Sequence, residues 1–294
     1  MMKLEQEIKF DIIEAAHMGM CFGVKAAIKN THQLATAHDV TVLGELAHNT
    51  HVKKQLELNG VRHGSLTDPK APTKDVIITA HGTSDTMRNK WKHLGHRVTD
   101  TTCPLVHKTH AAMKQLVASG YTPLVIGKSS HVEVRGLMGD FPTARAILNL
   151  EDLENLDIPT CPSKIKLGVV SQTTQQISHC EKIITAMRKK YPHTEIRFID
   201  TVCKPTKERQ SALIELCSKV KLIIVVVGKN SNNTAQLANK CKQLGCTSYH
   251  IQSPRDIRPE WFSGLDRIGL TAGTSTPDAQ IESVKQKLLE LSKS

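Results

Sequence analysis

Short apolar runs alternate with helix-patterned segments along almost the whole chain. The run at 221–227 is almost entirely apolar, which is typical of a strand covered on both faces. Between such runs, apolar residues recur at helical spacing, for example Ile177, Ile184 and Met187 within the segment 175–190. Because strands that alternate with helices form parallel sheets, the expected fold class is α/β.

Three details of this pattern are less regular. The section after Glu133 is expected to be irregular as far as an edge strand at 144–148. A helix is expected at 234–244. Near the end of the chain, Thr276 is expected to cap a last helix in which Pro277 takes the first position.

Three cysteines occupy equivalent places in the pattern. Cys21, Cys103 and Cys203 each stand between a strand-like run and a helix, and the last two belong to the similar stretches DTTCP at 100–104 and DTVCKP at 200–205. A period of roughly 80 to 100 residues is too long for a solenoid. We therefore expect three α/β domains around a pseudo-threefold axis. The expected domains are residues 1–102, 103–202 and 203–294.

The position of these cysteines favours metal chemistry. The start of a helix favours a thiolate, and three thiolates at one centre suit a soft metal, with an iron–sulfur cluster fitting best in a chain without a CxxC pair. Spacing alone is also compatible with unrelated buried cysteines, and the repeated D-T-x-C motif favours a shared site. The other five cysteines are expected to be plain core residues: Cys161, Cys180, Cys217, Cys241 and Cys246.

Polar side chains follow the predicted strands, at the ends where parallel sheets bind ligands. They comprise His48, His81, His131, Glu133, Thr173, Ser231, Asn232, Asn233 and Ser275. Imidazoles, hydroxyls and amides can donate hydrogen bonds to phosphate, and helix N-termini add to its stabilisation. Most of the fifteen histidines must have surface or structural roles, and the three chosen here differ by lying directly after strands. Glu133 could shuttle protons near a metal, although a lone exposed charge is the alternative.

Composition excludes several other classes. The formal charge of +11 favours anionic partners, but the basic residues are dispersed and aromatics make up only 3% of the chain, which argues against nucleic acid. We expect no transmembrane helix, because no long apolar run occurs. The polar N-terminus indicates the cytoplasm. Without a G-x-G-x-x-G motif, a nicotinamide or flavin domain is not supported.

Taken together, the motifs resemble those of the LytB/IspH family of 4-hydroxy-3-methylbut-2-enyl diphosphate reductases. The similarity runs from about Ala15 to Leu289. The segments that carry it are MGMCFGVKAAI, LAHNTHV, TAHGTSDTMRN, DTTCPLVHKTH, IGKSSHVEVRGLMG, VSQTTQ, DTVCKPTKERQ, VVGKNSNNT and LTAGTSTPD. Each segment is weakly diagnostic alone, and the set is highly specific.

This resemblance implies one [4Fe-4S] cluster held by Cys21, Cys103 and Cys203, with one open iron that binds the allylic oxygen of the substrate. It implies a proton donor, Glu133, with Thr173 near the substrate hydroxyl. It also implies a diphosphate pocket made of His48, His81, His131, Ser231, Asn233 and Ser275. The products would be isopentenyl and dimethylallyl diphosphates, the last step of the non-mevalonate isoprenoid pathway, and a ferredoxin or flavodoxin would supply electrons.

The sequence departs from the family pattern at a few positions. They are Met20, Val132, Asn232 and Lys204-Pro205. A diverged paralogue that acts on another small phosphorylated substrate is therefore an alternative. Two others are a redox-neutral iron–sulfur dehydratase, which needs no external electrons, and a non-enzymatic iron–sulfur sensor.

Overall fold

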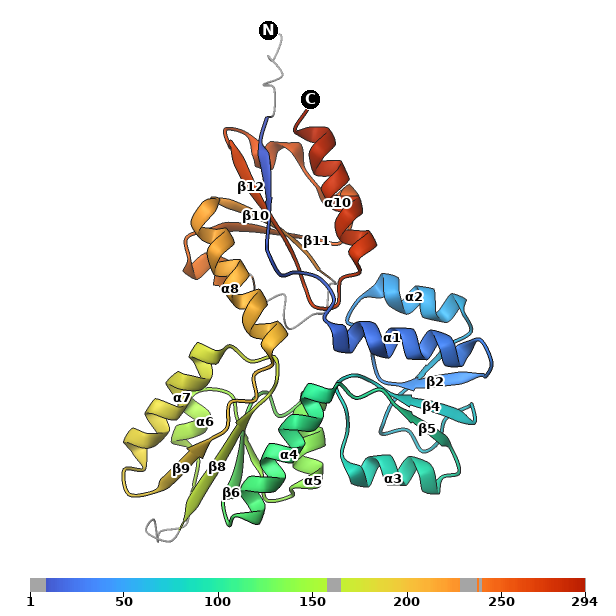
Figure 1. Cartoon of the computed structure of the whole chain (residues 1–294), viewed down its shortest axis with the longest axis vertical. Helices are drawn as coiled ribbons and strands as arrows, with labels where there is room; N and C mark the ends of the chain where they lie inside the picture. The colour runs from blue at the N-terminus through green and yellow to red at the C-terminus, as the bar shows by residue number, and fades with distance from the viewer. Residues whose placement is uncertain (1–8, 158–164, 228–236, 238–239, 294) are drawn as a thin grey trace. The chain divides into compact units, whose positions relative to one another are not determined.

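The computed structural model describes residues 9–157, 165–227, 237 and 240–293, and Figure 1 shows the course of the chain. Within these residues the strands form three four-stranded sheets, and each strand is parallel to its neighbours. The predicted α/β class is confirmed. Parallel strands need long crossover connections, and the helices between successive strands provide them.

The three sheets share one internal order. In two of the sheets, the strand that comes second in the chain lies at one edge and is followed by the first, the third and the fourth; the third sheet has this order when its strand from the beginning of the chain is counted last. The first sheet consists of β3 (Arg62–Gly64), β2 (Val40–Leu43), β4 (Asp75–Ile78) and β5 (Arg97–Asp100). The second consists of β7 (Arg145–Ile147), β6 (Thr122–Ile126), β8 (Lys166–Ser171) and β9 (Glu195–Phe198).

The third sheet is completed by a strand from the beginning of the chain. Its first three places are taken by β11 (Thr247–Ile251), β10 (Leu222–Val226) and β12 (Arg267–Ala272). The fourth place is taken by β1 (Asp11–Glu14), which pairs in parallel with β12. The expected domain limits and the pseudo-threefold axis stay predictions, but β1 shares a sheet with strands of the C-terminal third.

Helices flank these sheets. Their bounds are α1 (Phe22–Ala35), α2 (Thr50–Leu58), α3 (Asp85–His93), α4 (Pro104–Ala118), α5 (Val132–Asp140), α6 (Leu150–Glu154), α7 (Ile177–Lys190), α8 (Lys204–Lys219) and α10 (Asp278–Leu291). Two short 3₁₀ helices span Pro254–Asp256 and Pro259–Phe262. No helix in the described part of the chain combines the length and the apolar character needed to cross a bilayer.

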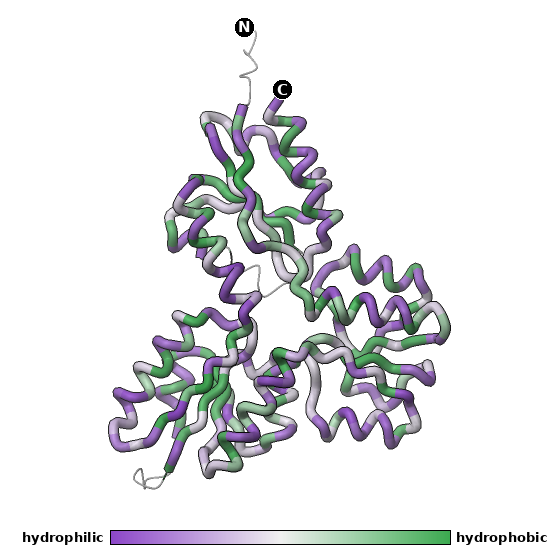
Figure 2. Tube along the Cα trace, in the orientation of Figure 1, coloured by the Kyte–Doolittle hydropathy of each residue, from purple (hydrophilic) through white to green (hydrophobic). Residues whose placement is uncertain are grey.

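Burial explains the apolar runs seen in the sequence. The inner strands β2, β4 and β10 are buried at every residue, whereas the edge strands β1, β5 and β9 are partly exposed. Figure 2 shows the same contrast, with apolar strands and helices of alternating hydropathy. Inner strands covered on both faces carry continuous apolar sequence, while helices need only one apolar face.

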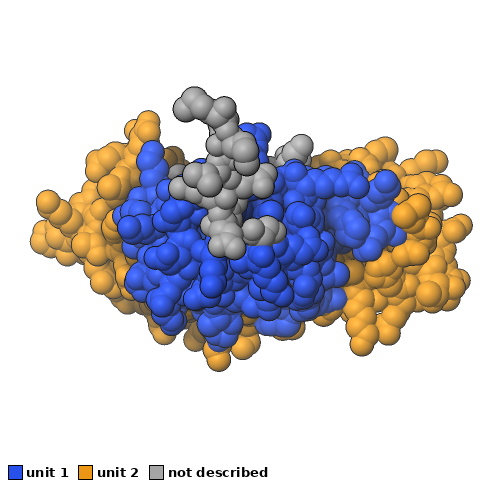
Figure 3. All heavy atoms as spheres, turned by 90° about the horizontal axis from the view of Figure 1, so that it is seen from above, with its two compact units in different colours: residues 1–25, 47–55, 208–294 blue, residues 26–46, 56–207 orange. Residues whose placement is uncertain are grey.

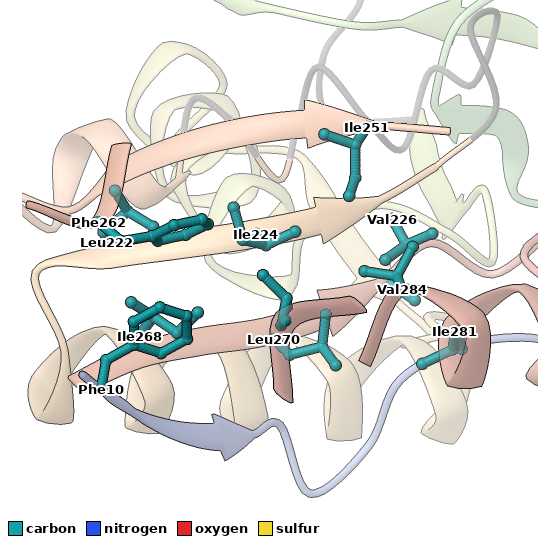
Figure 4. Close-up of a cluster of buried hydrophobic side chains, with 12 residues drawn as sticks. Phe10, Leu222, Ile224, Val226, Ile251, Phe262, Ile268, Leu270, Ile281 and Val284 are labelled. Atoms are coloured by element: carbon teal, nitrogen blue, oxygen red, sulfur yellow. The ribbon is translucent and has the colours of Figure 1, made fainter. Parts of the chain in front are cut away.

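The third sheet illustrates how a helix is held in place. From α10, Ile281, Val284 and Leu288 join a cluster with Ile224 and Leu270 of the sheet, most of which Figure 4 labels. The three helical positions recur at the spacing of one helix face. Each fully buried side chain of this size stabilises the fold by about 1.5–3 kcal/mol.

The chain divides into two compact units, which Figure 3 colours separately. One unit comprises residues 1–25, 47–55 and 208–294, and the other comprises residues 26–46 and 56–207. The third sheet belongs to the former, and the first and second sheets belong to the latter.

The section after Glu133 is helical, so the expectation of an irregular segment was wrong. Its two glycines and its valines lower helix propensity, but α5 packs tightly enough to offset this. A Cβ at Gly136 would lie 3.2 Å from the Thr83 backbone, and one at Gly139 would lie 2.8 Å from Ser84 Cβ. Close packing against the start of α3 therefore requires the residues that weaken the helical signal.

Two further expectations changed at element ends. The last helix begins at Asp278, with Pro277 in an extended conformation as its N-cap. Thr276 does not cap it, because its hydroxyl donates to the Val226 carbonyl instead, at 2.9 Å. The helix expected at 234–244 begins outside the described residues, while the edge strand expected at 144–148 is confirmed as β7.

Candidate active site

The D-T-x-C motif forms the turn between an edge strand and the helix that follows it. The Asp100 carboxylate accepts a hydrogen bond from the Thr102 backbone N–H at 2.9 Å. The Thr101 hydroxyl donates to the Ile78 carbonyl at the end of β4, at 2.6 Å. Burial raises the pKa of Asp100, but its hydrogen bonds from Thr102 and the charge of Arg88 outweigh that effect and lower it. The ionised aspartate thus fixes the turn that presents the following cysteine.

The second copy repeats this arrangement after β9. The Asp200 carboxylate accepts from the Val202 N–H at 3.0 Å, and the Thr201 hydroxyl donates to the Ser171 carbonyl at 2.6 Å. Sequence reasoning used the aspartate and threonine only as markers of a repeat. Their hydrogen bonds show that they hold the cysteine junction to the neighbouring strand.

Cys21 also lies between a strand and a helix, but the sequence before it lacks the D-T-x-C motif. It follows β1 and directly precedes α1. The Met20 N–H donates to the Thr276 carbonyl at 3.1 Å, and Gly19 turns the chain with a φ of 73°, a conformation that favours glycine. The Gly19 carbonyl accepts from Arg209 Nη2 at 2.8 Å. All three predicted metal ligands therefore follow the fourth strand of a sheet.

The environment of these three cysteines fits a thiolate-bound metal cluster. Cys21, Cys103 and Cys203 are each partly exposed, and a helix begins at the next residue of each. Helix N-termini stabilise thiolates, and partial exposure lets an iron–sulfur cluster enter. Within the described residues, no group of three or more His, Cys, Asp or Glu side chains stands close enough together to hold a metal ion.

The remaining described cysteines have the opposite character. Cys180, Cys217, Cys241 and Cys246 are all buried in hydrophobic clusters. Burial raises the pKa of the Cys180 thiol to about 12 and also raises that of Cys241. These thiols are poor thiolate donors, as expected for core residues. Cys161 lies outside the described residues.

One additional residue beside a cysteine was missed by sequence reasoning. The Thr206 hydroxyl lies 3.1 Å from the Cys203 sulfur, in the first turn of α8. The available signal was the spacing C-x-x-T at a helix start. A hydroxyl in this place can donate to a thiolate and stabilise its charge.

Glu133 and Thr173 form a buried pair at the ends of two elements. Glu133 lies in the first turn of α5, Thr173 follows β8, and their exposed fractions are 1% and 5%. The Thr173 N–H donates to Glu133 Oε1 at 2.8 Å, and its hydroxyl donates to Oε2 at 2.9 Å. Burial nevertheless dominates, and it raises the pKa of Glu133 to about 7. A carboxyl group with this pKa can hold and release a proton near neutral pH.

The pair is connected to one cysteine junction through the backbone. The carbonyl of Thr173 accepts a hydrogen bond from the Cys203 N–H at 2.9 Å. The backbone of Thr173 therefore contacts both the buried glutamate, through its N–H, and the cysteine junction, through its carbonyl.

Two of the predicted phosphate-binding histidines lie together. The rings of His81 and His131 meet edge to face, with centroids 5.6 Å apart. His131 caps α5, and its Nδ1 accepts from the Glu133 N–H at 3.3 Å. Because Nδ1 is the acceptor, a neutral ring carries its proton on Nε2, and an imidazole N–H is a hydrogen-bond donor of the kind that phosphate oxygens accept.

In the other unit, Ser275 lies beside the loop that carries His48. The Ser275 hydroxyl points at the His48 carbonyl, 3.5 Å away, and the serine is 6% exposed. The neighbouring Asn49 accepts from the N–H groups of His51 and Val52 and so caps α2. The remaining predicted pocket residues, Ser231, Asn232 and Asn233, lie outside the described residues.

Comparisons with known proteins agree with this architecture. The model of a family described as LytB protein matches residues 12–289. A 4-hydroxy-3-methylbut-2-enyl diphosphate reductase of Aquifex aeolicus is 34% identical over 284 residues, which cover 96% of each chain. The protein of the same name from Caldanaerobacter subterraneus is 35% identical over 287 residues, covering 96% of this chain and 97% of that one.

Solved structures are similar over the same extent. The E-1-hydroxy-2-methyl-but-2-enyl-4-diphosphate reductase from Plasmodium falciparum superposes with a TM-score of 0.85 at 29% identity, covering 96% of this chain and 88% of that one. A second structure, described as the terminal enzyme of the non-mevalonate pathway, gives a TM-score of 0.71 at 33% identity and covers 96% and 99% of the two chains.

Proposed function

Because the chain belongs to the LytB protein family, we propose that it reduces 4-hydroxy-3-methylbut-2-enyl diphosphate to isopentenyl and dimethylallyl diphosphates. In this reaction the allylic C–O bond breaks, the hydroxyl leaves as water, and a C–H bond forms. The balance requires two electrons and two protons for each substrate molecule. The chain must therefore bind a diphosphate, hold a proton and accept electrons.

The observation that carries the proposal is the contrast between two sets of cysteines. Those at helix starts are partly exposed, and the other described ones are buried in the core. Cys21, Cys103 and Cys203 would hold one [4Fe-4S] cluster through three thiolates. When bound, the cluster supplies electrons and one iron without a protein ligand, which serves as a Lewis acid.

Glu133 is the proton donor in this proposal. Its buried carboxyl is protonated through the mildly acidic range, because burial raises its pKa to about 7. The Thr173 hydroxyl, 2.9 Å from Glu133 Oε2, would orient the substrate hydroxyl and share the proton with it. Burial also keeps bulk water away from the acid, so that the proton goes to substrate.

The diphosphate would be bound by imidazole, hydroxyl and amide groups. His131 presents Nε2–H, because its Nδ1 accepts the backbone bond at 3.3 Å, and His81 lies against it. His48, Ser275, Ser231, Asn232 and Asn233 would contribute further hydrogen-bond donors. Groups of these three kinds can all donate hydrogen bonds to phosphate oxygens.

The reductant would be an acidic protein of the ferredoxin or flavodoxin type in the cytoplasm. The net charge of +11 would attract such a partner. The charge-driven part of the association should weaken as salt rises, because exposed charges are screened. Electron transfer measured against ionic strength tests this part of the proposal.

The whole proposal is tested by anaerobic reconstitution with iron and sulfide, followed by an assay with and without reduced methyl viologen. We expect isopentenyl and dimethylallyl diphosphates only when the reductant is present. Product formed without reductant would indicate a redox-neutral dehydratase instead. A full cluster with no turnover of this substrate would contradict the proposal and favour a sensor or a paralogue.

A further inference from the structure

The three cysteine junctions differ at the third residue after the cysteine, in the first turn of the following helix. Val24, Val106 and Thr206 occupy this position, and their exposed fractions are 8%, 4% and 9%. Valine and threonine have the same shape, but threonine carries a hydroxyl in place of one methyl group. A buried hydroxyl needs a hydrogen-bond partner, whereas a buried valine does not. Of these three residues, Thr206 is therefore the one whose burial requires a polar partner.

The partner of the Thr206 hydroxyl is the sulfur of Cys203. The hydroxyl oxygen lies 3.1 Å from Cys203 Sγ. Cys203 directly precedes α8, where the side chain of a capping residue accepts hydrogen bonds from the second and third residues of the helix. The second residue is Pro205, which has no N–H to donate, and the Thr206 N–H donates to the Cys203 carbonyl at 3.0 Å. The hydroxyl thus adds a hydrogen bond to the sulfur from within the first turn.

The backbone of the junction at Cys103 follows the same course. There the N–H groups of Val106 and His107 donate to the carbonyl of the preceding cysteine, at 2.9 and 3.2 Å. The N–H groups of Thr206 and Lys207 do the same in α8, at 3.0 and 3.1 Å. The two helix starts therefore share one backbone pattern, and a hydroxyl at position 106 would face its cysteine as the Thr206 hydroxyl does.

A hydrogen bond to a ligand sulfur acts on the redox states of an iron–sulfur cluster. A thiolate bound to iron carries no proton, so the hydroxyl is the donor in the contact between Thr206 and Cys203. The donated bond draws electron density from the sulfur, and it therefore stabilises the reduced, more negative state more than the oxidised state. Hydrogen bonds to the sulfurs are among the factors that set the reduction potential of such clusters.

We propose that Thr206 raises the reduction potential of the cluster by donating a hydrogen bond to Cys203 Sγ. This inference rests on the proposed function, which places the cluster on Cys203. Thr206 acts through the cysteine and takes no part in proton transfer. A higher potential favours the uptake of electrons from a donor of the ferredoxin type, which the proposed reaction requires.

The test is a redox titration of the reconstituted protein, in which the reduced cluster is followed by electron paramagnetic resonance. T206V gives this junction the side chain that the other two have. We expect the ratio of reduced to oxidised cluster in T206V to fall roughly tenfold at a fixed potential, a shift of about 59 mV toward lower potential. T206S keeps the hydroxyl and should retain the wild-type potential.

Two variants in α4 provide the control and the reciprocal change. The buried Thr109 hydroxyl donates to the Leu105 carbonyl at 3.2 Å, not to a sulfur. T109V therefore removes a buried hydroxyl and should leave the potential of the cluster unchanged. V106T adds a hydroxyl beside Cys103 and should raise the potential above that of wild type.

A vibrational measurement requires no electron transfer. In resonance Raman spectra of the oxidised cluster, one stretching band between iron and cysteine sulfur should lie at higher frequency in T206V than in wild type. The reason is that a sulfur without this hydrogen bond donates more electron density to iron. If T206V takes up no cluster, V106T decides: a potential above that of wild type supports the proposal, and an equal potential overturns it.

The outcomes separate this inference from the proposed function. An unchanged potential together with unchanged Raman bands in T206V would overturn the role of Thr206. An equal fall of the potential in T109V would overturn it too, because that result indicates a general effect of losing a buried hydroxyl. Wild-type protein that holds the cluster but does not turn over the substrate would overturn the proposed function, while the potentials still decide the role of Thr206. Wild-type protein that takes up no cluster would overturn both.

Discussion

Replacing Glu133 with glutamine should make the free energy of unfolding less sensitive to rising pH. The glutamate carboxyl is buried, and both of its oxygens accept from Thr173. A glutamine can keep this arrangement, because its oxygen can accept from the Thr173 N–H while its amide donates to the hydroxyl oxygen. The substitution therefore removes the titration of Glu133 and preserves its packing.

The magnitude follows from the pKa of Glu133, which burial raises from an ordinary 4.5 to about 7. A group whose pKa is raised in the folded state contributes stability that is complete below the unfolded pKa and is lost as the pH rises through the folded pKa. The loss here spans the range from 4.5 to about 7. The full shift corresponds to roughly 3 kcal/mol of unfolding free energy, most of which falls between pH 5 and pH 8.

Urea unfolding of wild type and E133Q at pH 5 and pH 8, under anaerobic conditions, measures this difference. The stability of E133Q relative to wild type should increase by roughly 2–3 kcal/mol from the lower pH to the higher. Loss of the cluster on unfolding contributes equally to both proteins and cancels. Turnover of E133Q should fall by about 10²- to 10⁴-fold, since the proton donor is absent. A stability difference that does not change with pH would refute the assignment of Glu133 as a buried acid.

Three further predictions concern the cysteine junctions and the core. Serine at Cys21, Cys103 or Cys203 should abolish cluster absorbance after reconstitution, whereas C180A should retain it; the reverse pattern would contradict the ligand assignment. D100A should lower the unfolding free energy by about 1 kcal/mol, as the loss of a cap does. It should also reduce the iron content after reconstitution, and D100N should partly restore that iron content. G168A should destabilise the protein by about 1–3 kcal/mol, because overpacked cores strain: its Cβ would lie 2.8 Å from that of Tyr121. A urea midpoint equal to that of wild type would show that this contact relaxes.

Much of the fold could be predicted because its elements are encoded locally. Inner strands are apolar throughout, since helices cover both of their faces. The candidate site residues could be found because parallel sheets bring strand ends together on one edge. This rule selected His81, His131 and Thr173, and the structure places His81 against His131 and Thr173 against Glu133.

Other features could not be predicted from the sequence, because they depend on contacts between distant segments. α5 looks irregular, and its glycines are explained only by the helix start that packs on them. The pairing of His110 with Asp140 spans thirty residues and two helices. The pairing of β1 with β12 joins opposite ends of the chain, and no local pattern records it. Each of these features is set by tertiary packing, which overrides propensity.

The junction that carries Cys21 shows what is repeated in this chain. Cys103 and Cys203 donate their own N–H groups to a carbonyl of a neighbouring strand-end loop, and at the first junction the N–H of Met20 does the same with the Thr276 carbonyl. The aspartate and threonine of the motif are missing there, and Gly19 makes the turn instead. What is repeated is therefore a backbone hydrogen bond at or next to the cysteine. The D-T-x-C motif is one of two sequences in this chain that allow it. The D-T-x-C motif identifies two of the three junctions. The order of strands in the sheets identifies all three, because each cysteine follows the strand in the fourth place of its sheet.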